Sequence, residues 1–237
     1  FSWLSIVNNR LRTFLSLLGV TIGIVAIISV FTIVDALEKN VRDSVESLGE
    51  NVVYIQKWPW GGSMDEEYQW WKYYKRPEVT FKEFREVKER CSNSNSVAFH
   101  FEGRRTVENG NNVLENVEIS GITYEFPQIL SFNMEEGRFF TQSEMSSGKN
   151  YVLIGHNVAE ALFDFNPVGE SIKISGINAK VIGLLEKQGE SITGNSQDNS
   201  VLCSYLFAKR FINERKSDPL IMISALEGVS NEQLKNE

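Results

Sequence analysis

The chain has 237 residues and a formal net charge of −7 at pH 7, from 24 basic and 31 acidic side chains. This acidic balance disfavours nucleic acid and an anionic lipid surface as the main partner, because both attract basic proteins. The two cysteines, Cys91 and Cys203, lie far apart in the sequence and make no disulfide framework, although one bridge outside the cytoplasm remains open.

Residues 1–12 precede a long apolar run. Apolar side chains recur among them at helical spacing, and Trp3 is a residue type found at the level of lipid headgroups. The pattern predicts a short amphipathic segment on the cytoplasmic surface of a membrane. Since the chain starts without methionine, further residues are expected upstream.

Residues 13–34 form the most apolar stretch of the chain. They contain no charge and no proline, and as a helix they span about 33 Å, the thickness of a bilayer's hydrocarbon core. A cleaved signal peptide has a shorter apolar core and a small-residue cleavage site, which the following Asp35–Glu38 does not supply. A buried soluble helix of this length normally has a polar face. The stretch is therefore predicted to be a transmembrane helix in a lipid bilayer.

Charges beside this stretch predict its orientation. Arg10 and Arg12 come directly before it, and basic residues favour the cytoplasmic side. Lys39 and Arg42 lie further beyond its other end, but still within the range over which basic residues influence orientation, and they weaken the assignment. We expect residues 1–12 in the cytoplasm and the rest of the chain outside it.

One face of the predicted transmembrane helix carries small residues. Gly19 and Gly23 are four residues apart, and Ser16 and Ala26 lie close to the same face. Small residues at this spacing let a second helix approach closely, although glycine is also common in transmembrane helices without such a role. The pattern predicts helix packing at Gly19 and Gly23.

Helical spacing of apolar residues continues after the membrane span, from residue 36 to 48, so the helix is expected to extend outward as an amphipathic stalk. Gly49 is a plausible end of this stalk. Residues 51–57 then alternate in polarity and predict a strand.

The segment from Lys57 to Pro77 is rich in aromatic residues and holds four of the five tryptophans, which are Trp58, Trp60, Trp70 and Trp71. Such side chains could lie at the membrane interface, contact a partner or form a small local core. An upright stalk of residues 36–48 would lift the segment about 20 Å above the membrane. We therefore expect the tryptophans to contact protein rather than lipid.

The remaining chain alternates short strands and short helices, with a β-rich middle section, and this predicts an α+β fold. Strands are expected at residues 97–101, 104–108, 113–121, 151–155, 171–175, 179–185, 201–204 and 220–226, with 171–175 and 179–185 forming a hairpin around Gly176. Helices are expected at residues 80–91, 124–130, 157–163 and 205–214. Two of the helix starts are capping boxes, Thr80 with Glu83 and Thr141 with Glu144.

The sequence supplies no recognisable catalytic or metal-binding motif. It contains no GxxxxGK[ST] loop for ATP and no G-x-S-x-G nucleophile turn. His100 and His156 are the only histidines, and neither has ligand spacing with the two cysteines. No enzymatic activity, cofactor or metal is therefore expected of this chain.

A series of short motifs in a fixed order resembles the periplasmic core domain of MacB-type permeases, which are relatives of the lipoprotein-release and FtsX permeases. The motifs lie at residues 9–12, 19–23, 48–51, 121–124, 136–141, 152–155, 159–163, 167–169, 172–174 and 181–183. Each motif alone is weak, but their order extends over almost the whole chain. The aromatic segment departs from the family pattern, so the resemblance assigns it no role.

The resemblance implies a fold with one N-terminal transmembrane helix and a two-lobed extracytoplasmic domain of mixed α/β structure. A porter-like lobe would comprise residues 35–96 and 201–237, and a β-rich middle lobe residues 97–200. Family members have four transmembrane helices with the external domain between the first and second. We therefore expect this chain to be a fragment of a larger permease.

The resemblance also implies a function. The chain would be part of the permease subunit of an ATP-driven (ABC) exporter or mechanotransmission complex, with ATP hydrolysis on a separate ATPase chain. A second permease subunit, and a possible periplasmic or outer-membrane partner, would complete the assembly. The alternative is a single-span membrane-anchored sensor or ligand-binding module, and the sequence downstream of residue 237 would distinguish the two. The substrate stays open.

Overall fold

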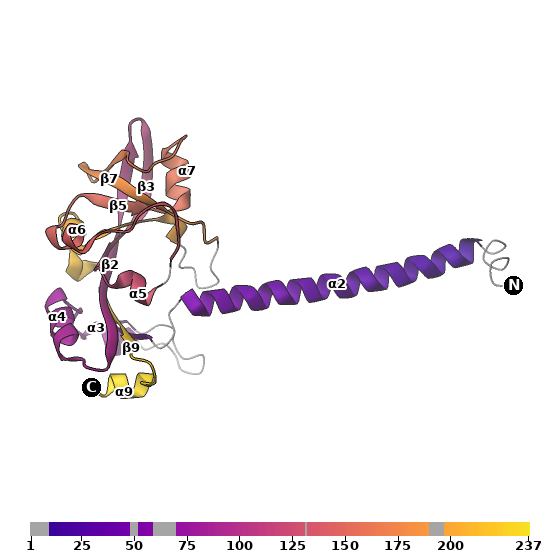
Figure 1. Ribbon diagram of the computed structural model, residues 1–237, viewed down its shortest axis with the longest axis horizontal. Helices are drawn as coiled ribbons and strands as arrows, with labels where there is room; N and C mark the ends of the chain where they lie inside the picture. The colour runs from indigo at the N-terminus through magenta and orange to yellow at the C-terminus, as the bar shows by residue number, and fades with distance from the viewer. Residues whose placement is uncertain (1–9, 48–51, 59–69, 131, 190–196) are drawn as a thin grey trace. The chain divides into compact units, whose positions relative to one another are not determined.

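The computed structural model describes residues 10–47, 52–58, 70–130, 132–189 and 197–237. These residues belong to two compact units, Phe1–Ser44 and Val45–Glu237. The first unit contains most of one long helix, and the second is a mixed domain of strands and short helices (Figure 1). The predicted fold class, an N-terminal apolar helix followed by a mixed α+β domain rich in strands, is confirmed.

The long helix is α2, and it runs without interruption from Arg10 to Ser47. The predicted transmembrane stretch and the predicted stalk are thus one helix, as their shared helical spacing indicated. The proposed stop at Gly49 and most of the predicted cytoplasmic segment, residues 1–9, lie outside the described residues.

The described part of the domain contributes nine strands to one sheet. They are β1 (Val52–Ile55), β2 (Ser94–Asn109), β3 (Asn112–Ile122), β4 (Met134–Gly137), β5 (Tyr151–Ile154), β6 (Ser171–Ile174), β7 (Ile177–Leu185), β8 (Ser200–Ser204) and β9 (Leu220–Ala225).

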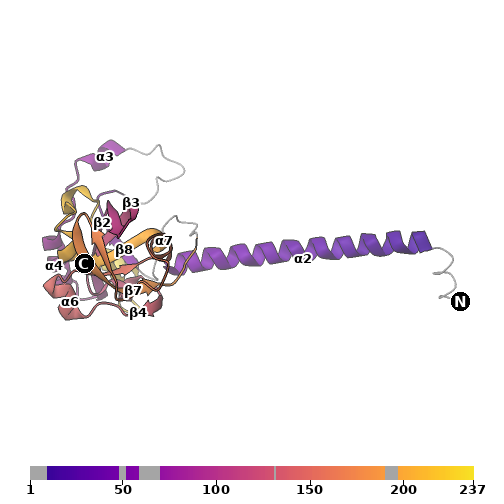
Figure 2. The same ribbon diagram turned by 90° about the horizontal axis from the view of Figure 1, so that it is seen from above.

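Short helices connect these strands. They are α3 (Trp70–Tyr74), α4 (Phe81–Arg90), α5 (Phe126–Ile129), α6 (Gln142–Ser147), α7 (His156–Leu162), α8 (Tyr205–Ala208) and α9 (Asn231–Lys235), with 3-10 turns η1 (Gln197–Asn199) and η2 (Glu214–Lys216). Seen from above, α3 lies on the opposite side of the domain from α6 and β4 (Figure 2).

Six of the strands close into a ring. Pairing runs from β2 to β3, β8, β5, β7 and β6, and from β6 back to β2 through Val107–Ile174 and Glu108–Lys173. The β3–β8 and β5–β7 pairs are parallel and the other four are antiparallel. A closed ring leaves no free sheet edge along these pairings, so the domain is built on a small mixed barrel.

Strand β2 connects the barrel to a small outlying sheet. Its first part, Ser94–His100, pairs with β9, and β9 pairs with β1 in an antiparallel register that places Val52 opposite Ser224. Its second part pairs with β3 and belongs to the barrel. The sequence predicted strands at residues 97–101 and 104–108 joined through Gly103, and in the structure they form one continuous strand. Gly103 leaves room for Ile212, since a Cβ there would come within 3.1 Å of the Ile212 side chain.

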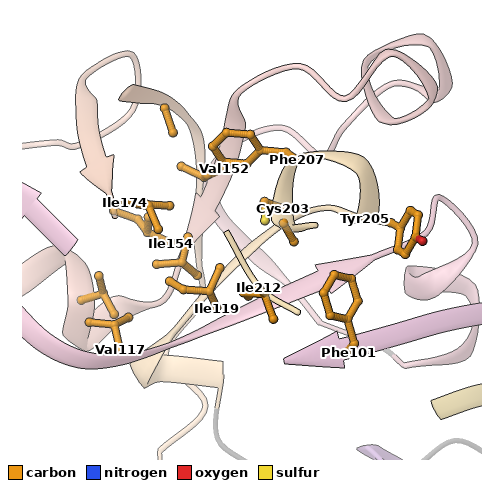
Figure 3. Close-up of a cluster of buried hydrophobic side chains, with 14 of the residues drawn as sticks. Phe101, Val117, Ile119, Val152, Ile154, Ile174, Cys203, Tyr205, Phe207 and Ile212 are labelled. Atoms are coloured by element: carbon orange, nitrogen blue, oxygen red, sulfur yellow. The ribbon is translucent and has the colours of Figure 1, made fainter. Parts of the chain in front are cut away.

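The barrel interior is filled by side chains that alternate along every strand of the ring. Figure 3 shows such side chains converging from β2, β3, β5, β6 and β8. The buried apolar residues are Phe101 and Val107 on β2, Val117 and Ile119 on β3, Val152 and Ile154 on β5, Ile172 and Ile174 on β6, Ala179 and Val181 on β7, and Val201 and Cys203 on β8. Alternation with period two is what places one side chain of each neighbouring pair inside the barrel.

A second cluster covers the other face of the same strands. Leu153 and Leu202 alternate with the interior residues and point away from them, toward α5, α6 and the segment before α6. Those elements supply Phe126, Phe140 and Met145 to the cluster. Strands β5 and β8 are therefore buried on both faces, which explains why β5 is apolar along its length and why Val201, Leu202 and Cys203 are apolar between the terminal serines of β8.

Turn chemistry was predicted correctly at the β6–β7 hairpin. Ser175 and Gly176 adopt positive φ of 48° and 79° at its two central positions. Two successive residues of positive φ are the signature of the tight hairpin turn that suits twisted strands, and glycine takes this conformation without strain.

The predicted helix at residues 205–214 is shorter than expected. Helix α8 ends at Ala208, and the carbonyl of Phe211 accepts hydrogen bonds from Nε and Nη2 of Arg105, at 3.1 and 2.6 Å, instead of from a helical N–H. Strand β4 was not predicted, because its four residues have no alternation of buried and exposed side chains.

The division into two lobes remains a proposal. The pairing is continuous across the proposed boundaries, since β2 crosses the one at residues 96 and 97. Strand β8, from the segment assigned to the porter-like lobe, lies between β3 and β5 in the ring.

Packing of the barrel interior predicts a large cost for truncation. Ile154 has 0% exposure, so Ile154→Ala should lower the free energy of unfolding of the chain by about 2–5 kcal/mol. Val113 on β3 is 57% exposed, and Val113→Ala should change it by no more than about 0.5 kcal/mol. Urea unfolding followed by circular dichroism measures both. Equal costs for the two variants would contradict the described interior.

Candidate functional site

Helix α2 has the length and surface of a membrane-spanning helix. Residues Phe14–Glu38 have a mean hydropathy of 2.7 in their most apolar window, and none of that window is buried within the protein. Leucine, isoleucine, valine and phenylalanine side chains at all helical phases are exposed, by 43% at Leu18 and 65% at Phe31. A helix that is apolar on all sides is stable in lipid or between other helices, and not in water.

Three hydroxyl groups in the apolar part of α2 are satisfied within the helix. Thr21 Oγ1 donates to the carbonyl of Leu17 at 2.8 Å, and Ser29 Oγ donates to that of Val25 at 2.8 Å. Thr32 makes the same bond one turn further on, at 2.9 Å. A polar group in hydrocarbon needs such an internal partner, so these side chains are compatible with lipid on every side.

Gly19 and Gly23 lie on the exposed surface of α2. A Cβ added at either glycine would meet no atom within 4 Å. The backbone is therefore accessible at both positions, which is the condition for a second helix to approach closely. That such a helix packs there remains a prediction.

The aromatic segment is closed at its base by an ion pair. Lys57 Nζ lies 2.6 Å from Oε1 of Glu78, and both side chains are largely buried, with 14% and 21% exposure. The same ammonium group lies 5.3 Å from the ring centre of Trp58 and 5.8 Å from that of Tyr74. Lys57 thus holds together the two chain ends that enter and leave the segment, a pairing across 21 residues that no local sequence pattern signals.

The four candidate partner-contact tryptophans are described to different extents. Trp58 is half-buried beside Lys57, and Trp71 on α3 is 53% exposed. Trp70 begins α3, but its side chain is outside the description, and Trp60 lies outside the described residues. Trp71 therefore retains surface for a contact beyond the domain, and that contact remains a prediction.

The motif at residues 136–141 builds a rigid corner after β4. Gly137 has a φ of 84°, and a Cβ there would lie 2.4 Å from the carbonyl oxygen of Ile182, so only glycine fits. Arg138 then makes a two-pronged ion pair with Glu144, at 2.8 and 2.7 Å, and also donates to the carbonyl of Phe139 at 3.0 Å. The main partner of Arg138 is therefore the carboxylate of the capping box.

Glu144 joins two structural features at once. Its Oε2 accepts the backbone N–H of Thr141 at 2.8 Å, which completes the predicted capping box of α6, while Arg138 binds both carboxylate oxygens. The Arg138 hydrogen bonds, followed by those of Thr141, lower the pKa of Glu144 to about 2 from an ordinary value of 4.5. Charge-assisted bidentate bonds of this kind are among the stronger polar contacts in proteins.

The lowered pKa predicts a pH dependence. A carboxylate whose folded pKa is depressed contributes stability that is complete above its unfolded pKa, near 4.5, and is lost as the pH falls toward 2. Glu144→Gln should lower the free energy of unfolding by about 1–3 kcal/mol at pH 7. The difference from wild type should shrink between pH 4.5 and 2. The matched control is Glu115→Gln, at an exposed position on β3.

Urea unfolding at a series of pH values checks this prediction. A difference between wild type and Glu144→Gln that stays constant from pH 6 to pH 3 would contradict the role of the ionised carboxylate. So would a pH-dependent loss of equal size in Glu115→Gln.

The histidines and cysteines do not come together. Cys91 is half-buried, Cys203 is buried in the barrel, and both are free thiols. Burial raises the pKa of the Cys203 thiol and lowers that of His100 to about 4. His156 lies 3.1 Å from Glu135 and 3.3 Å from Glu160. Among the described residues no three such side chains gather at a distance that suits a metal ion.

Sequence reasoning also missed a group of basic side chains around one groove. They come from α4 and from the segment between α8 and η2, which are over 100 residues apart in sequence. Only the fold brings them together, so no local motif could have revealed them.

The long apolar helix and the barrel-based domain together identify the family. The sequence model of the MacB-like periplasmic core domain matches residues 13–237, which include both the apolar helix and the domain. The chain therefore belongs to the MacB-like periplasmic core domain family, and the resemblance found in the sequence is confirmed.

Two curated relatives illustrate the similarity. The macrolide export ATP-binding/permease protein MacB of Chlorobium luteolum is 29% identical over 84% of this chain and 29% of that protein. The pyoverdine export ATP-binding/permease protein PvdT of Pseudomonas aeruginosa is 24% identical over 94% of this chain and 32% of that protein. The chain thus spans about a third of the length of these relatives.

A solved structure shows the same fold. The crystal structure of the periplasmic region of MacB from Actinobacillus actinomycetemcomitans aligns with a TM-score of 0.65 at 14% identity. The alignment covers 81% of this chain and 82% of that one. At this identity the likeness supports the fold of the domain and no further property.

Proposed function

We propose that the chain is part of the permease subunit of an ATP-driven exporter, or of a related mechanotransmission complex. The observation that carries the proposal is the family match over residues 13–237, because a single family model includes both the apolar helix and the domain that follows it. Relatives named as export permeases support this function over a single-span sensor. In this proposal the helix anchors the domain in the inner membrane, with the N-terminus in the cytoplasm and the domain in the periplasm.

ATP hydrolysis is proposed to occur outside these residues, on a separate ATPase chain or on another part of the same protein. The second arrangement is the one that the names of MacB and PvdT give those proteins, since they combine ATP-binding and permease functions, and these residues match only about a third of each. The 237 residues contain no P-loop sequence. A second permease subunit, and a periplasmic or outer-membrane partner, would complete the complex.

The continuity of α2 supports a mechanical role. Its 38 residues measure about 57 Å along the axis, well beyond the roughly 30 Å of a hydrocarbon core. A helix without a break transmits a displacement along its length, because its backbone hydrogen bonds resist bending at any single point. ATP-driven motion of the span would thereby pass to the helix's extramembrane part.

Helix packing at the small-residue face is the first test. In the intact permease reconstituted with its ATPase, Gly19→Leu/Gly23→Leu should weaken association of permease subunits about tenfold, because the larger side chains prevent close approach. Transport-coupled ATPase activity should fall with it. Subunit association is measured by energy transfer between labelled subunits in bilayers.

The matched control is Thr21→Leu/Val25→Leu, which has the same spacing on the opposite helix face, since two residues rotate the helix by about 200°. It should leave association and coupled activity close to wild type. Normal assembly and coupling in the glycine variant would remove the packing proposal, while loss in both variants would point to a general membrane defect.

Tryptophan fluorescence tests the partner contact. We propose that the aromatic segment meets protein rather than lipid, since aromatic side chains bury much area at interfaces with few rotatable bonds. In Trp3→Phe protein every remaining tryptophan lies at residues 58–71. Quenchers attached to lipid tails should then reduce the fluorescence only weakly.

A variant that retains Trp3 and replaces the other four tryptophans with phenylalanine is the positive control, and its fluorescence should be quenched strongly at the membrane surface. Strong quenching of the Trp3→Phe protein would show that the aromatic segment reaches the bilayer, and the contact proposal would fail.

A further inference from the structure

A groove of about 700 Å³ lies between the N-terminal end of α4 and the segment from α8 to η2. This volume is within the range of pockets that hold small molecules. Five basic side chains line it: Lys82, Arg85, Lys209, Arg210 and Arg215. Their concentration contrasts with the net charge of −7 of the whole chain.

The one carboxylate in the wall of the groove is already occupied by the protein. Glu214 Oε1 accepts the backbone N–H of Phe81 at 2.9 Å, and its Oε2 accepts the hydroxyl of Tyr205 at 2.8 Å. Lys209 Nζ lies 3.8 Å from the same carboxylate and donates to the Tyr205 hydroxyl at 3.1 Å. The charge of Glu214 therefore compensates that of Lys209, and its hydrogen bonds hold Phe81 and Tyr205 in the wall of the groove. It does not compensate the other four cations.

The remaining cations are weakly paired. Arg210 donates from Nη1 to the neutral side-chain oxygen of Asn150 at 2.6 Å. Lys82 makes an exposed ion pair with Glu86 at 3.5 Å, a type that adds little stability. Within the described part of the chain, Arg85 and Arg215 lie within 4.0 Å of no carboxylate. Both are exposed at the groove and keep their guanidinium donors available.

An apolar surface lies beside these charges. The rings of Phe81 and Tyr205 stack with centroids 3.9 Å apart and an angle of 8° between their planes. Phe81 and Phe211 both line the groove and are only half-buried. The groove thus offers guanidinium forks and apolar rings to the same occupant.

We propose that this groove binds a small organic anion that carries a carboxylate or phosphate group on an apolar body. Planar guanidinium groups match both anions through paired hydrogen bonds, while Phe81 and Phe211 contact the apolar part. The inference is independent of the transport function proposed above, because it rests on the groove alone.

Isothermal titration calorimetry on the full chain in detergent tests the proposal, with phenyl phosphate as the probe. Wild type should bind it saturably at one site, in the millimolar range or tighter. Inorganic phosphate should bind more weakly, and phenol should give no saturable heat. Arg85→Gln/Arg215→Gln should weaken phenyl phosphate binding about tenfold or more, because each charged hydrogen bond is worth more than about 1.4 kcal/mol.

Two further variants make the result specific. Arg85→Lys/Arg215→Lys keeps both charges and should retain more affinity than the glutamine variant. Lys173→Gln/Lys180→Gln removes two exposed cations on β6 and β7 that do not line the groove, and it should bind as wild type does. Both arginines are exposed, so the urea midpoint of each variant should match that of wild type.

Absence of saturable phenyl phosphate binding to wild type would overturn the proposal. Equal weakening in the Lys173→Gln/Lys180→Gln control would do the same, since it would show binding to general surface charge. Phenol binding as tight as phenyl phosphate would overturn the anion specificity, and inorganic phosphate binding as tight would overturn the apolar contribution.

Discussion

The domain depends on the closure of six strands into a ring. Only two residue pairs, Val107–Ile174 and Glu108–Lys173, join β6 to β2 and complete it. Yet closure is what converts an open, twisted sheet into an enclosed interior in which alternate side chains of every strand meet. Ile174 contributes both to the closure of the ring and to its interior, since its backbone belongs to a closing pair and its side chain lies in the core.

Elements outside the ring follow from the same constraint. Because β2 extends beyond its pairing with β3, its first part reaches past the ring and pairs with β9, which in turn pairs with β1. Helix α4 covers this extension through Phe84, which belongs to the same cluster as the barrel interior. The extension of β2 and the barrel interior therefore share one continuous cluster of buried side chains, beside the second cluster on the other face of β5 and β8.

Local features of the fold could be predicted from the sequence, and distant pairings could not. Both capping boxes, at Thr80 and Thr141, and the turn at Gly176 have the expected geometry, because each depends on residues only a few positions apart. The position of β8 between β3 and β5 has no local signal, since its apolar sequence fits any buried strand.

The candidate sites show the same limit. The apolar character of α2 and its glycines can be identified from the sequence alone, because a membrane span is a property of consecutive residues. The Lys57–Glu78 pair closes a loop of 21 residues, and Glu214 reaches Phe81 across 133 positions. Polar contacts at such separations depend on the chain path between the two residues, which residue type alone does not determine.

The pairing of β1 with β9 has a mechanical consequence. Val52 at the start of β1 lies opposite Ser224 near the end of β9, so the chain enters and leaves this sheet at the same end of an antiparallel pair. A force that pulls the start of β1 away from the end of β9 would break the hydrogen bonds between the two strands one after another. Little force would be needed, because only one bond is loaded at a time. A force that moves the start of β1 and the end of β9 together loads none of these bonds and displaces the whole sheet. The domain would therefore stay intact when it is displaced as a whole, and it would open more easily when the two ends are pulled apart. This suits a rigid lever more than a spring.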